Sequence, residues 1–508
     1  MPTPSASAAL SALVLILVYE ALRAVIVGGV KRWLSGGALR FVRRNRVQLD
    51  SARFIDRLWL RERLLRDEAV DAALLESARA RGVPEAELRE KVRAWVMEIV
   101  PAFSLAAYYR FGAVVARGAV DACFELVFKT RDFEARGRKV PPGAVIVYVM
   151  NHRSNADYVV LSVGLLRHVA LSYAVGEWAR VWPLDVLFRS FGSFFVRRGE
   201  QDRLYHKVLE RYVQILLAQG GVTGFFIEGR LSRDGALGPP KAGLLDAIVG
   251  LRREFPDREI AFLPIGLNFD HVLEDRSLIR ERANARPPGL LEKLASLAWF
   301  LARVPWLVGA RAARLALRGY RKFGTAAVAA GDPVLLSAWE AEARGPDGAP
   351  LPAGGLAALP FEARRPMIKV LAADLLAAVG RTVPATPVPL VCAALLQDPD
   401  ARVSAITDRV RALVARLRAV GAPVTLGAAF TAPREMESNE LGYLEAEVSA
   451  LEEAERIVTL AGYNLARRGL VRHVEGRLEI IGENLDLIQY YARSLAQHLP
   501  ESAQTAGP

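Results

Sequence analysis

The sequence contains little cysteine, and it lacks the patterns of several common kinds of binding site. Only two of its 508 residues are cysteine. Cys123 and Cys392 lie far apart in apolar surroundings, which indicates core packing in a reducing compartment rather than a disulfide framework or a nucleophile. No zinc-ligand spacing, RNA-binding aromatic signature or basic heptad region is present, so we expect no nucleic acid partner.

The N-terminus lacks the basic residues that precede the apolar core of a secretory signal peptide. Its apolar run, residues 8–19, is too short to span a bilayer, and extending it through residues 8–30 places Glu20 and Arg23 near the middle. We therefore expect an interfacial or partly inserted anchor, with a plain buried helix as the alternative. Basic residues over 31–46 predict a peripheral or shallowly anchored body on the cytoplasmic face of the inner membrane.

The composition is apolar and basic. Hydrophobic residues make up 52% of the chain, the formal net charge is +12 and the mean hydropathy is +0.18. This length allows two to four domains with a sizeable core. Because the positive charge is spread along the chain, it favours an anionic membrane surface, phosphorylated substrates or an acidic carrier protein as partners.

The most informative stretch joins a predicted buried strand to a polar turn. Val145 to Met150 is a β-branched and aromatic run, and the following residues, 151–157, are nearly all polar. They contain His152 and Asp157 in an H-x-x-x-x-D arrangement. A turn of this length can fold the carboxylate onto one imidazole nitrogen, which leaves the other nitrogen to take a proton from a hydroxyl. Alone, such a histidine is more often structural, so its interpretation depends on the other segments.

Three more apolar segments are also followed by polar residues. The predicted strands are 194–196, 224–227 and 260–267, and Phe124 to Phe128 predicts a further strand near the start of the same core. Ligands in open α/β sheets lie beyond the strand ends, so these segments predict one shared crevice. Adjacent Arg197 and Arg198 suit an anion there, although a solvated pair is the plainer interpretation.

These segments resemble a known family. NHRSNADYVVL, FGSFFVRR, FFIEGRLSRDGALGPPKAGLL and FLPIGLNFDHVLE, in this order, resemble the four blocks of the glycerolipid acyltransferase superfamily. The segments between them, GEWARVWPLDVLFRSFG and RLYHKVLERYVQILLAQGG, are similar to the membrane-bound glycerol-3-phosphate acyltransferase branch, whose relatives include dihydroxyacetone-phosphate acyltransferases. The likeness is strong over residues 145–275, returns over 320–334 and is weaker in TPVPLVCAALL and IQYYARSLA.

The resemblance implies an O-acyltransferase of phospholipid biosynthesis. It would move a fatty acyl group from acyl-CoA or acyl carrier protein to the sn-1 hydroxyl of glycerol 3-phosphate, giving lysophosphatidic acid without a metal or organic cofactor. His152 would be the general base and Asp157 would orient it. The implied substrate-binding positions match the later blocks or adjoin them: Arg197, Arg198, Glu228, Gly229, Arg230, Ser232, Arg233, Lys241 and Pro264.

Some residues depart from the family pattern. The third block usually reads E-G-x-R-S-R, but Leu231 occupies the first arginine position and Arg230 precedes it. Asn155, the pair Phe269-Asp270 and Arg493 also differ from the residues common in the branch. These departures keep dihydroxyacetone phosphate or lysophosphatidic acid open as acceptors. A catalytically impaired scaffold that binds lipid or acyl carrier is the alternative from another class, and the intact first block favours the enzyme.

The predicted fold is α/β, with a mixed sheet core flanked by helices, an N-terminal membrane-associated helical segment and a C-terminal helical region. The predicted organisation is an N-terminal helical region over 1–110, the acyltransferase domain over 111–340, a linker over 341–356 and a C-terminal helical region over 357–508. Residues 288–322, which contain Trp299 and Trp306, predict either an interfacial helix pair or an amphipathic helix on the core.

Overall fold

The computed structural model describes residues 57–100, 113–165, 172–176, 194–197, 200–283, 322–345, 348–399, 401–427 and 452–499. The predicted anchor over 8–30 lies outside these ranges, as do Trp299 and Trp306 of the predicted interfacial helices. No helix in the described ranges is long and apolar enough to cross a membrane.

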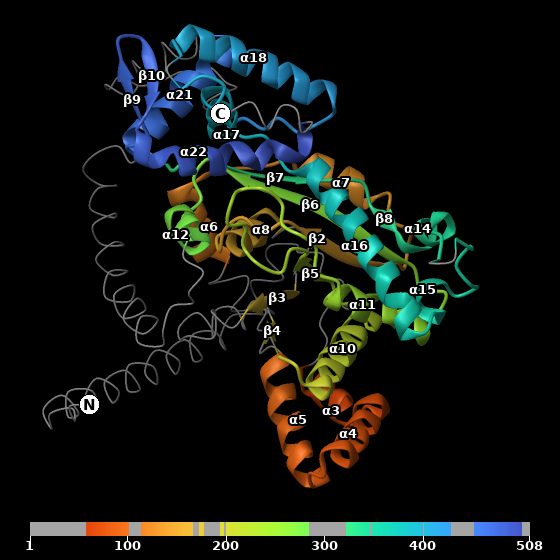
Figure 1. The fold of residues 1–508 in the computed structure, drawn as a ribbon. Helices are drawn as coiled ribbons and strands as arrows, with labels where there is room; N and C mark the ends of the chain where they lie inside the picture. The colour runs from red at the N-terminus through yellow and green to blue at the C-terminus, as the bar shows by residue number, and fades with distance from the viewer. Residues whose placement is uncertain are drawn as a thin grey trace, which may run out of the picture.

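A mixed sheet of eight strands forms the centre of the described structure (Figure 1). In chain order the strands are β1 (Glu125–Phe128), β2 (Val145–Met150), β3 (Ser172–Gly176), β4 (Phe194–Val196), β5 (Thr223–Phe226), β6 (Ile260–Phe269), β7 (Thr325–Ala330) and β8 (Val334–Leu335). Their order in the sheet is β1-β7-β6-β2-β5-β3-β4, with β8 also paired to β6. The predicted mixed sheet is thus confirmed, and its predicted strands agree with the observed ones to within two residues.

Strand direction places the ends of several strands at one edge of the sheet. β2 is parallel to both β5 and β6, and β3 is parallel to β5 and β4. Only β7 and β8 run antiparallel to β6, while β1 runs parallel to β7. The segments after β2, β4, β5 and β6 therefore leave the sheet at the same edge, as expected for one crevice.

Two hydrophobic cores cover the two faces of the sheet. Along β2, Val145, Val147 and Val149 belong to one core, whereas Tyr148 and Met150 belong to the other. This alternation follows from the two-residue period of a strand. Since both faces are buried, the central strands are almost entirely apolar, and all ten residues of β6 are buried.

The first core joins the sheet to the N-terminal helices. These are α3 (Arg57–Leu65), α4 (Glu68–Arg81) and α5 (Glu85–Ile99), which pack on α10 (Arg203–Ala218) beside α11 (Gly243–Val249) and a short 3₁₀ segment, η4 (Gly250–Arg253). Asp67 caps α4 through the amides of Ala69 and Val70 and also pairs with Arg211 of α10 at 2.8 Å. The cap thus holds the start of α4 against the core.

The second core joins the sheet to α6 (Ala113–Cys123), α7 (Thr130–Gly137), α8 (Asp157–Leu165), α12 (Asp275–Ala283) and most of the C-terminal region. That region includes α17 (Pro387–Leu395), α18 (Val403–Ala419), α21 (Glu453–Arg467) and α22 (Leu485–Ala492), with a hairpin of β9 (Val471–Val474) and β10 (Arg477–Ile480) and the 3₁₀ segments η5 (Gly482–Asn484) and η6 (Arg493–His498). Figure 1 shows α22 lying along the sheet near β7. The predicted helical C-terminal region is confirmed.

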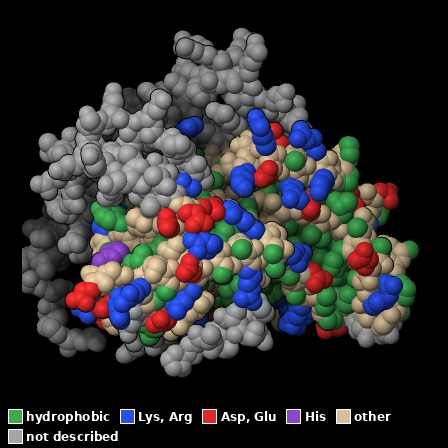
Figure 2. Space-filling model, turned by 90° about the horizontal axis from the view of Figure 1, so that it is seen from above, with side chains coloured by type: hydrophobic (Ala, Val, Ile, Leu, Met, Phe, Trp, Pro, Cys, Tyr) green, Lys and Arg blue, Asp and Glu red, His purple; other side chains and the backbone are tan. Residues whose placement is uncertain are grey.

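The remaining helices follow β8. They are α14 (Leu336–Glu342), α15 (Gly355–Ala358) and α16 (Phe361–Thr382), and α16 packs against β6 (Figure 1). The outer face of the C-terminal helices carries Lys and Arg side chains interspersed with Asp and Glu (Figure 2). Ion pairs such as Arg411–Glu452 and Arg418–Glu453, both at 2.7 Å, account for part of this pattern. The described part of this face therefore carries charges of both signs.

Candidate active site

The turn after β2 is held against its neighbours by Asn151. Its side-chain nitrogen donates to the carbonyl of Leu267 at 3.0 Å, and its oxygen accepts from the amide of Leu267 at 2.8 Å. This pair of bonds extends the β2–β6 ladder one residue beyond the strand. It thereby fixes where the following histidine leaves the sheet.

His152 and Asp157 lie side by side and are fully buried. The His152 Nδ1 is 2.9 Å from Asp157 Oδ2, and the two residues are 1% and 0% exposed. The same carboxylate oxygen accepts the amides of Arg153 at 2.7 Å and Ser154 at 3.1 Å. Asp157 is the first residue of α8, where the orientation of the helix dipole favours a negative charge.

This geometry determines which imidazole nitrogen can act as a base. An ionised carboxylate only accepts hydrogen bonds, so His152 Nδ1 carries the proton and donates it to Asp157. The Nε2 atom is then an acceptor, and it has no hydrogen-bond partner in the described structure. A buried acceptor in this state is suited to take a proton from a bound hydroxyl.

The segment after β5 encloses the histidine. The His152 ring stacks on Phe226 with ring centroids 3.9 Å apart. The backbone amide of His152 donates to the carboxylate of Glu228 at 2.9 Å. The His152 carbonyl accepts the amide of Ser232 at 3.0 Å. The first and third of the predicted segments are therefore interlocked around the same residue.

Glu228 is buried between two amide donors. Its second carboxylate oxygen accepts the amide of Gly238 at 2.7 Å. Burial raises the pKa of Glu228 to about 7, although these two hydrogen bonds act in the opposite direction. The carboxyl thus changes its protonation state near neutral pH while in contact with the backbone of His152.

The pKa of Glu228 makes stability depend on pH. Because the pKa of Glu228 in the folded protein is higher than the ordinary glutamate value of 4.5, its contribution to the free energy of unfolding falls as pH rises from about 4.5 to about 7. The fall is on the order of 3 kcal/mol. Urea unfolding across this pH range measures the free energy of unfolding of native protein and of Glu228→Gln. The value for native protein minus the value for the variant should fall by about this amount as pH rises. A constant difference would contradict the assignment, and exposed Glu87→Gln serves as control.

The C-terminal region closes over the segment after β5. Gly235 has φ +89° and lies so close to the carbonyl of Tyr490 in α22 that no side chain fits between them. Arg493 lies 3.4 Å from Asp234 of the same segment. The end of the chain is therefore part of the wall around His152, and only glycine allows this close approach.

The structure separates the cations that were predicted to bind the acceptor. Arg197 forms a bidentate pair with Glu98 of α5 at 3.0 and 2.7 Å, whereas Arg198 lies outside the described residues. Arg233 lies 3.4 Å from Glu281, and Arg230 is exposed. Leu231 packs against the core, so Arg230 and Leu231 point in different directions.

Three other predicted substrate-binding residues, Ser232, Gly229 and Lys241, lie in the segment after β5. Ser232 is buried, and its hydroxyl accepts the amide of Gly235 at 3.0 Å. Gly229 has φ +66° beneath the side chain of exposed Lys241, whose amide donates to Ile227 at 2.7 Å. Glycine and lysine thereby shape the turn after β5.

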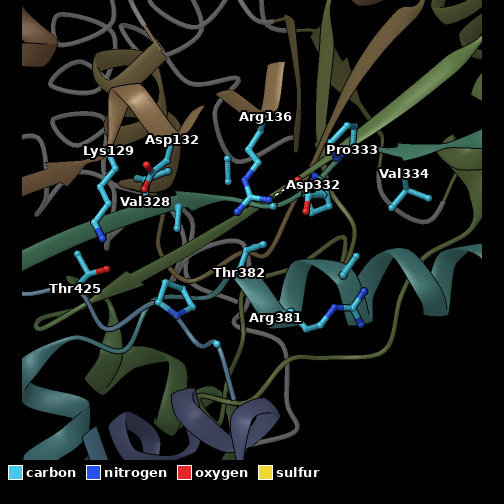
Figure 3. Close-up of a pocket in the computed structure, with 17 residues that line it drawn as sticks. Lys129, Asp132, Arg136, Val328, Asp332, Pro333, Val334, Arg381, Thr382 and Thr425 are labelled. Carbon is cyan, nitrogen blue, oxygen red and sulfur yellow. Dashed lines mark ion pairs between the residues drawn. The ribbon is translucent and has the colours of Figure 1, made fainter. Parts of the chain in front are cut away.

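Pro264 lies in the middle of β6, away from the strand end. It faces a cavity of about 440 Å³ that is bounded by α7, the end of β7 and the end of α16. In Figure 3 the Arg136 side chain points toward Asp332, with which it forms an ion pair. Together with Lys139, Arg136 holds the pKa of Asp332 below its usual value. Because β7 is antiparallel to β6, its end and this cavity lie away from the edge that carries His152.

Comparison with known proteins identifies the family. Residues 132–268 match the family described as Acyltransferase, and residues 312–460 match the one described as Glycerol-3-phosphate acyltransferase C-terminal region. The chain belongs to the glycerol-3-phosphate acyltransferase family. The first match contains His152, Asp157 and Glu228, while Tyr490 lies beyond the second.

Curated relatives of the glycerol-3-phosphate acyltransferase family resemble part of the chain. The glycerol-3-phosphate acyltransferase of Colwellia psychrerythraea is 28% identical over 229 residues, which cover 44% of this chain and 28% of that protein. That of Shewanella loihica is 32% identical over 218 residues, covering 42% and 26%. The match thus spans less than a third of the length of either relative.

Among solved structures, the 1-acyl-sn-glycerophosphate acyltransferase of Thermotoga maritima is 15% identical. The likeness covers 56% of this chain and 82% of that one, with a TM-score of 0.26. A likeness this low establishes nothing further about the chain.

Several residues at this site were not singled out from the sequence. Glu274 accepts the hydroxyl of Ser154 at 2.7 Å, and burial raises the pKa of its carboxyl. Arg153 and Tyr490 are buried against each other. Arg153 adjoins His152, and Glu274 ends the fourth block FLPIGLNFDHVLE, so the sequence carried a signal for both. Tyr490 lies in IQYYARSLA, whose weaker likeness to the family did not connect it with the histidine.

Proposed function

We propose that the chain transfers a fatty acyl group from a thioester donor to the sn-1 hydroxyl of glycerol 3-phosphate, forming lysophosphatidic acid. The observation that carries this proposal is the buried His152–Asp157 pair with an acceptor nitrogen at Nε2. Family membership supports the reaction type. The intact pair also favours an enzyme over a scaffold that only binds lipid or acyl carrier.

In the proposed reaction, His152 Nε2 takes the proton of the acceptor hydroxyl as its oxygen attacks the thioester carbonyl. A carbon–oxygen bond forms and the carbon–sulfur bond breaks, and the thiolate leaves with the proton from the imidazolium. Asp157 keeps Nδ1 protonated and stabilises the positive charge that appears on the ring. Two backbone amides hold Asp157 in place, so the pair does not reorganise during the transfer.

Acyl-CoA and acyl carrier protein are the proposed donors, and the proposed location is the cytoplasmic face of the inner membrane. The basic charge of the chain suits either acidic donor and an anionic lipid surface.

On α3, Trp59 and Leu65 are exposed near Arg63 and near Arg66, which follows the helix, a composition typical of interfacial segments. Flotation with phosphatidylglycerol vesicles tests this location, and failure to float would contradict it.

A specific observation supports an acceptor other than glycerol 3-phosphate. Leu231 is partly buried against the core at a position where the family usually has arginine, and Arg230 is exposed. A changed acceptor, either dihydroxyacetone phosphate or lysophosphatidic acid, therefore stays as the second candidate.

An acceptor panel tests the proposal. Purified full-length protein is supplied with palmitoyl-CoA or palmitoyl-acyl carrier protein and each of glycerol 3-phosphate, dihydroxyacetone phosphate and lysophosphatidic acid. We expect the highest kcat/KM with glycerol 3-phosphate. A higher value with another acceptor would change the substrate, and no transfer to any acceptor by folded protein would support the scaffold.

A further inference from the structure

Arg153 is a buried guanidinium with unused hydrogen-bonding capacity. It follows His152 directly and is 2% exposed. Its Nη1 donates to the carbonyl of Gly235, and its guanidinium carbon lies 5.1 Å from the ring centre of Tyr490. Within the described structure, Nε and Nη2 have no hydrogen-bond partner. Two donor nitrogens of one arginine are thus left without an acceptor.

The other buried arginines of the described ranges, Arg211 and Arg364, each have a carboxylate partner. Arg364 is 6% exposed and pairs with Asp246 at 2.8 Å, and Arg211 is 9% exposed and pairs with Asp67 at 2.8 Å. Among the described residues, the Arg153 guanidinium forms no ion pair, and its influence on a carboxyl at this turn is to oppose the rise that burial causes in the pKa of Glu228. An unpaired charge in the interior is strongly destabilising, so such a cation is expected only where an anion joins it.

Tyr490 places a second polar group without a partner beside this arginine. Its side chain is 1% exposed, and its hydroxyl has no hydrogen-bond partner in the described structure. Burial raises the pKa of Tyr490 to about 12, so the hydroxyl stays protonated and can donate. Arg153 and Tyr490 therefore each have at least one hydrogen-bond donor without an acceptor in the described structure.

We propose that Arg153 and Tyr490 bind the phosphate of the acceptor. The inference rests on the proposed function for the identity of the acceptor, but the chemistry of the pair indicates a phosphate monoester in any case. A guanidinium can give two N–H groups to phosphate oxygens, and the tyrosine hydroxyl adds a third donor. His152 and Arg153 belong to the same turn after β2, so the proposed base and the proposed phosphate ligand are positioned by one segment.

Two of the other predicted cations already have carboxylate partners, and Arg230 and Lys241 are exposed to solvent. Arg197 is already engaged by both oxygens of Glu98, and Arg233 pairs with Glu281. Binding a phosphate through either would require the existing pair to break or share its donors. Arg153 requires no such exchange, and it lies next to the catalytic histidine.

Binding of glycerol 3-phosphate without any acyl donor tests the proposal by titration calorimetry. We expect Arg153→Gln to raise the Kd at least about tenfold and Tyr490→Phe to raise it by about threefold to tenfold, with the KM for palmitoyl-CoA nearly unchanged. Arg153→Lys keeps the charge and should recover part of the affinity. Arg364→Gln removes another buried, ring-stacked arginine and should lower the melting temperature without changing the Kd.

The outcomes separate this inference from the proposed function. Inorganic phosphate and dihydroxyacetone phosphate are titrated in parallel, with glycerol as the unphosphorylated probe. If native protein binds phosphate-bearing probes and Arg153→Gln does not, the phosphate site stands even where acylation prefers another acceptor. Native affinity in folded Arg153→Gln would overturn the inference, as would a loss of affinity found only in Arg197→Gln.

Discussion

Replacement of His152 with alanine is expected to lower kcat for acyl transfer by about 10²- to 10⁴-fold, because it removes the general base. The His152 side chain contacts Phe226, Tyr158 and Asp157, whereas its Nε2 has no hydrogen-bond partner in the described structure. The loss should therefore appear in kcat, with a small change in the KM for either substrate. Steady-state kinetics with glycerol 3-phosphate and palmitoyl-CoA measure both constants.

The matched control is His473→Ala, which removes an exposed histidine in β9. It should leave kcat unchanged. Since the His152 ring is stacked in the core, urea unfolding of both variants must accompany the kinetics. A stable, folded His152→Ala protein with native kcat would exclude His152 as the base.

Replacement of Asp157 with asparagine is expected to lower kcat by about 10²-fold or more through loss of charge. An amide oxygen at the position of Oδ2 can still accept from His152 Nδ1 and from the backbone amides of Arg153 and Ser154. The amide nitrogen would take the position of Oδ1, which has no partner in the described structure. The substitution therefore removes the negative charge that stabilises the imidazolium and preserves the local bonds.

Asp157→Ala provides the comparison, because it also leaves three donors without their acceptor. It should lower the free energy of unfolding by several kcal/mol more than Asp157→Asn, whereas both should lose activity. Equal stability of the two variants would show that the hydrogen bonds to Asp157 are unimportant. Native kcat in Asp157→Asn would show that the charge is unimportant.

The strands and the His152–Asp157 arrangement could be predicted because their causes are local in the sequence. The apolar run of β2 and the polar turn after it are contiguous, and six residues contain both members of the pair. The parallel strands then bring Glu228 to the same edge of the sheet, which the shared pattern of strand followed by polar turn also indicated. Burial on both faces explains why these strands are mostly apolar.

The partners of the arginines could not be predicted in the same way. The pairing of Arg197 with Glu98 joins residues 99 positions apart in the chain, and Arg153 meets the ring of Tyr490 from the other end of the sequence. Such contacts depend on how helices pack on the sheet, which hydrophobic periodicity does not specify. Resemblance to the family assigned roles by motif position, whereas burial and existing ion pairs decide which guanidinium can accept a new anion.

The C-terminal region was predicted as helical, but its relation to the active site was left open. The structure brings Tyr490 and Arg493 to the segment that contains Asp234 and Gly235. A glycine with positive φ is a weak signal in a sequence because many turns require one. Only the packing shows that this glycine allows the close approach of α22.

Formation of 1-acyl-glycerol 3-phosphate by native protein and by His152→Gln in parallel time courses tests the central claim most directly. Radiolabelled glycerol 3-phosphate is supplied with palmitoyl-CoA or palmitoyl-acyl carrier protein, and the position of the acyl group in the product is determined. The account predicts sn-1 product from native protein and at least about 10²-fold less from the variant. Product formed at equal rates by both proteins would contradict the account.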